Sequence, residues 1–168
     1  MDYRLPELDD QTLLQAYVQE HFNCGEESIS ASMGLLAAEY GDWVKKIHRN
    51  ASTGDDAWGR SLLHLCFEQG KLIGLLSIRY ELPETLTQIY GDIGYGVRPS
   101  ERNQGYATRM LRDALSVCRE KGLRQVTLGC YKDNIASVKT ILNNGGVLIA
   151  ENDNYHEGRI SQYYLIKL

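Results

Sequence analysis

Residues 94–108 read Gly-Tyr-Gly-Val-Arg-Pro-Ser-Glu-Arg-Asn-Gln-Gly-Tyr-Ala-Thr, an apolar strand end followed by a polar turn that opens an amphipathic helix. Gly105 and Ala107 leave the backbone of the turn uncovered, so an anion can approach the unpaired N–H groups at the helix start. The helix dipole adds roughly 0.3–1 kcal/mol for each favourable charge. Arg98 and Arg102 supply cationic donors nearby. The segment therefore predicts a phosphate-binding turn.

Two common nucleotide-binding loops do not fit this segment. A Walker A loop ends in Gly-Lys-Ser or Gly-Lys-Thr, which is absent here. A dinucleotide fingerprint needs a third glycine, and Pro99 occupies that position after Gly94 and Gly96. We therefore expect a phosphate site of a different kind.

Two short segments resemble one enzyme family. Residues 102–107, Arg-Asn-Gln-Gly-Tyr-Ala, resemble the Arg/Gln-x-x-Gly-x-Gly/Ala loop of the GNAT acetyltransferases, which joins strand four to helix three and binds the pyrophosphate of acetyl-coenzyme A. Asn134 followed by Ser137 resembles the Asn-x-x-Ala/Ser segment with which the family contacts the cofactor. The 29 residues from Gly105 to Asn134 are what one helix and one strand require. The sequence of residues 94–102 resembles the sequences of a bacterial subgroup described as predicted acetyltransferases.

The resemblance implies acetyl-coenzyme A as cofactor and an N-acetyltransferase in which a primary amine of a small molecule or peptide attacks the thioester directly. It also implies that a backbone N–H near Val97 polarises the carbonyl, because strands four and five splay apart in the family. Tyr106 packs on the cofactor or on the neighbouring turn. The residues that the resemblance assigns to cofactor binding are Tyr95, Val97, Arg98, Arg102, Asn103, Gln104, Gly105, Tyr106, Ala107, Thr108, Asn134 and Ser137.

The general base has two candidates. Asp92 precedes the turn, close to where family members often place an acidic residue. If Ile93 and Tyr95 share one face of the strand, Asp92 faces the other, because side chains alternate along a strand. Glu81 is the competing candidate. The alternative for both residues is a solvated or salt-bridged carboxylate without a catalytic role.

The general acid of the family is missing. Many members carry a tyrosine seven positions after the Asn, where this chain has Ile141. Tyr131, Tyr163 and Tyr164 are the nearest replacements by strand order. A thiol with a pKa near 8.5 also departs as the anion with modest help, so catalysis is not excluded. The alternative is a non-catalytic acyl-coenzyme A-binding module.

Composition indicates one domain over residues 1–168, since 168 residues with 43% apolar and 24% charged content are ordinary for a globular domain. The four cysteines form no CxxC pair and the four histidines have no partner at ligand spacing, so we expect reduced thiols and no metal site. No apolar run approaches membrane-spanning length, and the first residues lack a signal-peptide core. We therefore expect a cytoplasmic protein without membrane partners.

Charge is distributed unevenly along the chain, whose net charge is −4. Residues 1–60 hold eleven Asp and Glu against five Lys and Arg, whereas residues 98–139 hold nine Lys and Arg against four Asp and Glu. The basic segment suits a polyanionic cofactor, and the acidic segment suits a cationic acceptor or forms solvated helix faces. Nucleic acid is not expected as a partner. A homodimer is compatible with the sequence, which leaves the oligomeric state and the acceptor open.

Periodicity predicts an α/β fold, and the order of its elements resembles the GNAT fold. Helices are expected over about residues 10–22, 32–49, 103–121 and 134–143, and strands over 61–67, 72–80, 89–97, 124–131, 147–150 and 160–168, with 1–6 a short strand or extended arm. This order gives a mixed, mostly antiparallel central sheet of six to seven strands with about four helices on both faces.

Overall fold

Seven strands and five α-helices make up the described part of the chain, residues 1–153, 156 and 158–168 of a computed structural model. The strands are β1 (Asp2–Arg4), β2 (Ser61–Glu68), β3 (Lys71–Arg79), β4 (Ile93–Val97), β5 (Gln125–Tyr131), β6 (Val147–Asn152) and β7 (Ser161–Lys167). The helices are α1 (Gln11–Asn23), α2 (Tyr40–Ser52), α3 (Glu84–Tyr90), α4 (Tyr106–Glu120) and α5 (Ile135–Asn143), with 3-10 turns η1 (Leu8–Asp10) and η2 (Pro99–Glu101). None of these helices is long and apolar enough to traverse a bilayer.

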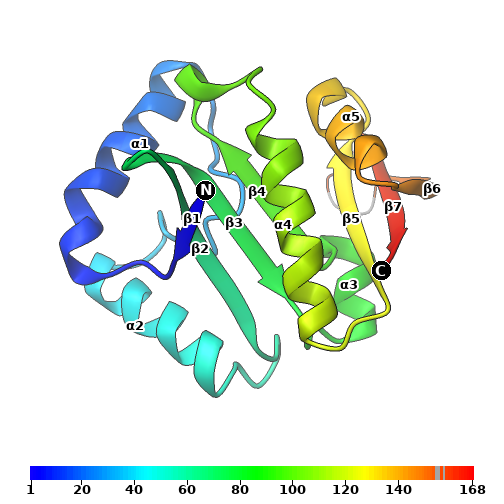
Figure 1. The fold of residues 1–168 in the computed structure, drawn as a ribbon, viewed down its shortest axis with the longest axis horizontal. Coiled ribbons are helices and arrows are strands. Elements are labelled where there is room, and N and C mark those ends of the chain that lie inside the picture. Colours follow the sequence, from blue (N-terminus) through cyan, green and yellow to red (C-terminus); the bar gives the residue numbers. More distant parts are fainter. Residues whose placement is uncertain (154–155, 157) are drawn as a thin grey trace.

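The strands form two antiparallel sheets, where the sequence predicted one mixed sheet (Figure 1). Their strand orders are β1-β2-β3-β4 and β5-β7-β6. The sheets are joined where Asp92 donates its N–H to the Thr127 carbonyl at 2.7 Å and the Asp92 carboxylate accepts the Thr127 N–H at 2.7 Å. Beyond this junction β4 and β5 form no ladder, because the two strands diverge. The divergence is the feature that positions the site.

Helices cover both faces of the first sheet, as predicted. Trp43 of α2 and Leu63 of β2 belong to the core cluster on the face of α1 and α2. Met110 of α4 belongs to the cluster on the opposite face, which also holds the inner side of the second sheet and α5. Neighbouring residues of β3 divide between the two, since Leu75 joins the first cluster and Leu76 the second. Burying each such side chain contributes roughly 1.5–3 kcal/mol.

The second predicted helix starts later than expected. It begins at Tyr40, so the prediction that it starts at residue 32 is wrong. Ala31, Met33 and Gly34 have φ angles of 61°, 48° and 87°, which an α-helix does not tolerate. The segment before α2 is therefore a chain of turns that lies against the first sheet.

The predicted strand over residues 89–97 is also shorter than expected. Residues Glu84–Tyr90 form α3, and β4 starts at Ile93. Gly91 ends α3 with a φ of 69°, and a Cβ there would lie 2.7 Å from the Thr127 carbonyl oxygen. Only glycine allows this approach, which brings α3 onto β5 beside the junction of the sheets.

Candidate active site

The N-terminus of α4 has no side-chain cap. Gly105, at the N-cap position, has a φ of 79°, and Asn103 has a φ of 61°. The backbone N–H groups of residues 103–108 have no acceptor within the part of the chain that the structure describes. A Cβ placed on Gly105 would meet no atom within 4 Å. The predicted turn is thus an open set of N–H donors at a positive helix end, which is the arrangement that anions bind.

Arg98 ties this turn to α1. Its guanidinium donates to Glu20 Oε2 at 2.8 and 2.5 Å, and Glu20 Oε1 accepts the N–H of Ser100 at 2.7 Å. Burial raises the pKa of Glu20, but the hydrogen bonds from Arg98 and Ser100 outweigh it and hold the pKa at about 2. Arg98, predicted as a phosphate donor, therefore holds the turn in place.

Arg102 is held in a similar way. Its Nη1 lies 2.5 Å from Glu26 Oε1, and its Nε donates to the Val97 carbonyl at 3.0 Å. The hydrogen bond from Arg102 lowers the pKa of Glu26. Glu26 also contacts the buried ring of His21, with 2.7 Å between Oε2 and Nδ1. Sequence reasoning missed Glu20 and Glu26, although the charge contrast between residues 1–60 and residues 98–139 was their signal.

The side of β4 that faces β5 carries main-chain groups outside any ladder. Arg98 donates its N–H to the Ile73 carbonyl at 2.8 Å, which identifies the residues of β4 whose main-chain groups bond to β3. Ladder bonds of an antiparallel pair recur at every second residue, so Tyr95 and Val97 direct their N–H groups to the opposite edge. These two N–H groups therefore lie outside the β3–β4 ladder, and their role in catalysis stays a prediction.

Tyr95 reaches from β4 to α5. Its hydroxyl lies 2.9 Å from Ser137 Oγ, which joins two predicted cofactor residues from segments 42 residues apart. Burial raises the pKa of Tyr95 to about 12. Asn134 caps α5, because its Oδ1 accepts the Ser137 N–H at 3.1 Å. Ile141 is 1% exposed and belongs to the core, so the family's usual acid position is apolar here.

Asp92 is buried at the junction of the two sheets, with 8% of its surface exposed. Its carboxylate lies toward the neighbouring strand β5, where it accepts the Thr127 N–H. Alternation of side chains between the two faces of a strand did not predict this direction. Burial raises the pKa of Asp92, and the hydrogen bond from Thr127 and the charge of Arg79 oppose this only in part. A carboxylate with a raised pKa is a stronger base than a surface carboxylate.

The other two predicted catalytic residues each contact an arginine. Glu81 accepts the Arg60 N–H at 3.0 Å and its guanidinium at 2.9 and 2.5 Å, and these bonds lower the pKa of Glu81. Glu81 is therefore the salt-bridged carboxylate that the sequence allowed. Tyr131 ends β5 with the Arg159 guanidinium 3.6 Å from its ring centre. The catalytic roles of Tyr131 and Glu81 stay predictions.

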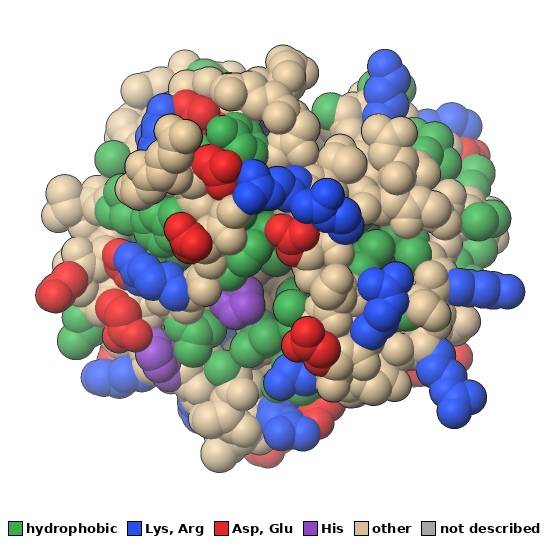
Figure 2. All heavy atoms as spheres, in the orientation of Figure 1, with side chains coloured by type: hydrophobic (Ala, Val, Ile, Leu, Met, Phe, Trp, Pro, Cys, Tyr) green, Lys and Arg blue, Asp and Glu red, His purple; other side chains and the backbone are tan. Residues whose placement is uncertain are grey.

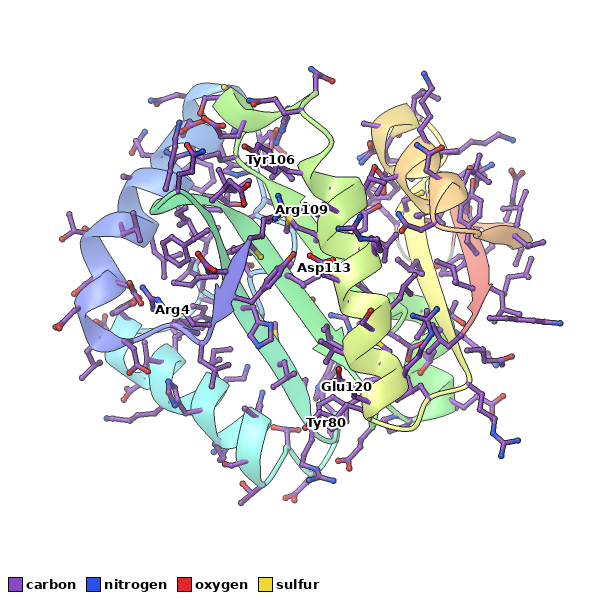
Figure 3. The ribbon with its side chains drawn as sticks, in the orientation of Figure 1. Arg4, Tyr80, Tyr106, Arg109, Asp113 and Glu120 are labelled. Atoms are coloured by element: carbon purple, nitrogen blue, oxygen red, sulfur yellow. The ribbon has the colours of Figure 1, made fainter. Side chains whose placement is uncertain are left out.

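The remaining residues of the turn lie at the start of α4. Figure 3 shows Tyr106 and Arg109 at this end of the helix. Gln104 donates to Glu101 at 3.2 Å, and the Thr108 carbonyl accepts from the Asn144 amide at 3.2 Å. Ala107 is half-buried in the first turn of the helix. These contacts hold the turn from outside, and none of them uses the N–H groups of residues 103–108.

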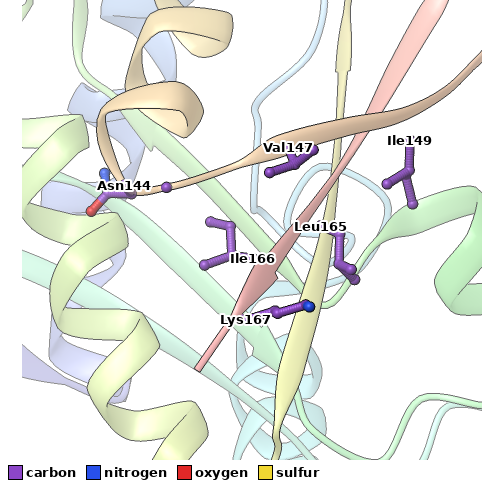
Figure 4. Close-up of a pocket in the computed structure, with 7 residues that line it drawn as sticks. Asn144, Val147, Ile149, Leu165, Ile166 and Lys167 are labelled. Atoms are coloured by element: carbon purple, nitrogen blue, oxygen red, sulfur yellow. The ribbon is translucent and has the colours of Figure 1, made fainter.

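Two surface cavities lie away from this turn. One of about 400 Å³ is lined by Val147, Ile149 and Leu165 of β6 and β7 (Figure 4). Exposed hydrophobic side chains of β6 border it, among them Val147 and Ile149. Hydrophobic side chains appear at the right edge of Figure 2, where Figure 1 places β6 and β7. The other, of about 500 Å³, lies between α1 and the segment before α2 and is bordered by Phe22 and Leu36. Neither is lined by residues 92–108.

Sequence comparison identifies the family. The profile of the Acetyltransferase (GNAT) family matches residues 35–145, which is 111 of the 168 residues. The chain therefore belongs to the GNAT acetyltransferase family and to the class of acyltransferases. The resemblance predicted from the two short segments is confirmed. A comparison with curated protein sequences found no match.

Solved structures share the fold at low identity. RimL, the ribosomal L7/L12 alpha-N-protein acetyltransferase in complex with coenzyme A, is 20% identical, with a TM-score of 0.72 over 99% of this chain and 93% of that chain. The microcin C7 self-immunity acetyltransferase MccE, in complex with acetyl-coenzyme A and AMP, is 16% identical, with a TM-score of 0.72 over 99% and 91%. Ribosomal-protein-alanine N-acetyltransferase from Brucella melitensis is 14% identical, with a TM-score of 0.70 over 100% of both chains. These similarities confirm the predicted fold.

Proposed function

We propose that this chain is an acetyl-coenzyme A-dependent N-acetyltransferase that acts as one domain in the cytoplasm. It transfers the acetyl group to a primary amine of a small molecule or peptide by direct attack. The observation that carries the proposal is the uncapped N-terminus of α4, which follows the strand edge of β4 that pairs with no other strand. Membership of the family supports it, as do the complexes of RimL with coenzyme A and of MccE with acetyl-coenzyme A.

The turn before α4 fits a pyrophosphate. The N–H groups of residues 103–108 are the donors, and the missing side chain of Gly105 leaves room for the phosphate oxygens. Arg98 and Arg102 act mainly by fixing the shape of this turn, through Glu20 and Glu26. Binding therefore rests on main-chain donors, whose number and direction the fold sets.

The edge of β4 leads from this turn toward Asp92. Val97 and Asp92 are five positions apart, which is about 16 Å along an extended strand. A pantetheine arm has about a dozen bonds between phosphorus and sulfur, so it spans on the order of 15 Å when extended. A thioester held from the turn therefore comes within reach of the junction of the sheets, with Tyr95 beside it.

The chemistry needs a neutral amine and a polarised carbonyl. An alkylamine with a pKa of about 10.4 costs about 4 kcal/mol to deprotonate at pH 7.4. Asp92 accepts this proton, directly or through water, since its pKa is raised. The bound cofactor supplies the electrophilic thioester carbon. The N–H groups of Tyr95 and Val97 on the open edge of β4 stabilise the developing oxyanion.

A non-catalytic acyl-coenzyme A-binding module is the second candidate, favoured by the buried Ile141 at the usual acid position. Calorimetric titration with coenzyme A and a free-thiol release assay over a panel of primary amines separate the two. Turnover with any amine establishes the enzyme. Tight binding with no turnover across peptide, polyamine and aminoglycoside acceptors establishes the module instead, and no binding contradicts both.

A further inference from the structure

The side chain of Tyr95 lies next to the position from which the family's usual acid is missing. Its hydroxyl is 2.9 Å from Ser137 Oγ and 3.4 Å from the Ser137 carbonyl oxygen. Ser137 and Ile141 are four residues apart in α5, so they lie on the same face of the helix. The phenol from β4 therefore lies within one helical turn of the buried Ile141.

Tyr131 lies on the other side of β5. Strand residues alternate, and Cys130 packs on the core cluster that contains α4 and α5, together with Tyr95. Its neighbour Tyr131 consequently faces away from α5, with the Arg159 guanidinium stacked on its ring. Tyr95, in the middle of β4, is the tyrosine whose hydroxyl contacts Ser137 of α5.

We propose that Tyr95 replaces the missing helical tyrosine and donates a hydrogen bond to the sulfur that leaves during acetyl transfer. This inference rests on the proposed function and adds a catalytic residue to it. The nitrogen–carbon bond forms, the carbon–sulfur bond breaks, and the electron pair leaves on sulfur. The amine proton goes to Asp92, and the Tyr95 hydroxyl keeps its proton while it stabilises the thiolate.

The acidity of the phenol agrees with hydrogen bonding in place of full proton transfer. Burial raises the pKa of Tyr95 to about 12, well above the pKa of about 8.5 for a thiol. A thiolate therefore does not take the proton from Tyr95 at equilibrium. A hydrogen bond to a charged acceptor still stabilises it, so removing the hydroxyl is expected to slow the chemical step about 10- to 100-fold.

The test measures the pKa of the coenzyme A thiol bound to the protein, by ultraviolet absorbance of the thiolate in a pH titration. Tyr95→Phe is expected to raise this pKa by about 1 to 2 relative to wild type. The measurement needs only coenzyme A binding, so it remains informative if no acceptor is turned over. In the acetyl-transfer assay, kcat falls and the KM for acetyl-coenzyme A stays within about threefold.

Tyr3→Phe is the matched control. The Tyr3 hydroxyl donates to Asp113 at 2.7 Å, so this variant also loses a partly buried side-chain hydrogen bond, but one that joins β1 to α4. It is expected to leave the pKa of the bound thiol unchanged. An unchanged thiol pKa in folded Tyr95→Phe that still binds coenzyme A would overturn the proposal, as would a loss of kcat in Tyr131→Phe alone.

Discussion

The N-termini of α4 and α5 both lie in segments that resemble cofactor contacts, but they are completed differently. At α5, Asn134 accepts the Ser137 N–H at 3.1 Å and closes the helix with its own side chain. At α4, Gly105 has no side chain to offer, and the first N–H groups stay without an acceptor in the described residues. The contrast supports the proposal that the α4 terminus binds the anion, because a capped terminus such as that of α5 has fewer donors left for one.

The arginines around α4 extend this comparison. Arg98 and Arg102 lie beside the open terminus, yet Glu20 and Glu26 hold their guanidinium groups against α1 and the segment after it. Much of the positive charge that the sequence shows near the turn is thus neutralised within the chain. In the proposed complex, the attraction for a diphosphate therefore comes from the amides and the helix dipole, which do not depend on side-chain charge.

Gly105→Glu is expected to have the largest effect. It places a carboxylate in the anion site and strains a backbone with a φ of 79°, so the affinity for coenzyme A should fall more than about 100-fold in calorimetry. Gly122→Glu is the matched control at the other end of α4, with a φ of 86° and similar open space. Equal losses of affinity in the two folded variants would remove the distinction between the ends of the helix.

Asp92→Asn is expected to lower kcat about 100- to 1,000-fold, since it removes the proposed base while an amide oxygen still accepts the Thr127 N–H. Burial raises the pKa of Asp92, and only its ionised form accepts a proton. Wild-type activity should therefore rise with pH through that raised pKa. The activity of the Asp92→Asn variant should not show this rise with pH. A pH–rate curve with the same acidic limb in both proteins assigns the base to another group.

Glu20→Gln is expected to destabilise the fold by about 1–2 kcal/mol at pH 7, because it breaks the ion pair with Arg98. The folded pKa of about 2 lies below the ordinary value of 4.5, so the stabilisation is complete above about pH 4.5 and is lost as the pH falls toward 2. Urea unfolding at several pH values measures both effects. Glu27→Gln, at an exposed site in the segment after α1, is the control. Equal acid sensitivity in the Glu20 variant and wild type contradicts the role of this pair.

Asn134→Ala is expected to have the smallest effect. Loss of the α5 cap lowers stability by about 1 kcal/mol, and the affinity for coenzyme A falls less than about tenfold. Asn134→Asp keeps a capping oxygen and should restore the stability. Thermal unfolding and calorimetry measure the two quantities. A larger loss of affinity than in Gly105→Glu would reverse the assignment of the two helix ends.

The amphipathic and alternating segments were predictable because each follows from local spacing. α4 begins three residues after its predicted start, and β5 and α5 each begin one residue after theirs. α3 was missed because residues 84–90 are few, contain two threonines and follow Pro83, a pattern that also fits the entry to a strand. The late start of α2 depends on left-handed residues such as Met33, whose conformation no periodicity reports.

The site residues also divide into those that a local pattern predicts and those that depend on distant parts of the chain. The glycine turn was recognisable because Gly105 acts through its own backbone. The pairing of Glu20 with Arg98 joins residues 78 positions apart, and no local pattern encodes such a contact. The sideways carboxylate of Asp92 follows from the junction of two sheets, which the sequence predicted as one.

The most direct test of the central claim is a titration of the isotope-labelled protein with coenzyme A, followed by the backbone amide resonances in NMR. The amides of residues 103–108 are expected to show the largest shifts, and the amides of Tyr95 and Val97 should follow. The Ser137 amide, already bonded to Asn134, should shift less. Saturable binding with the amides of residues 103–108 unperturbed would contradict the assignment of the α4 terminus as the diphosphate site.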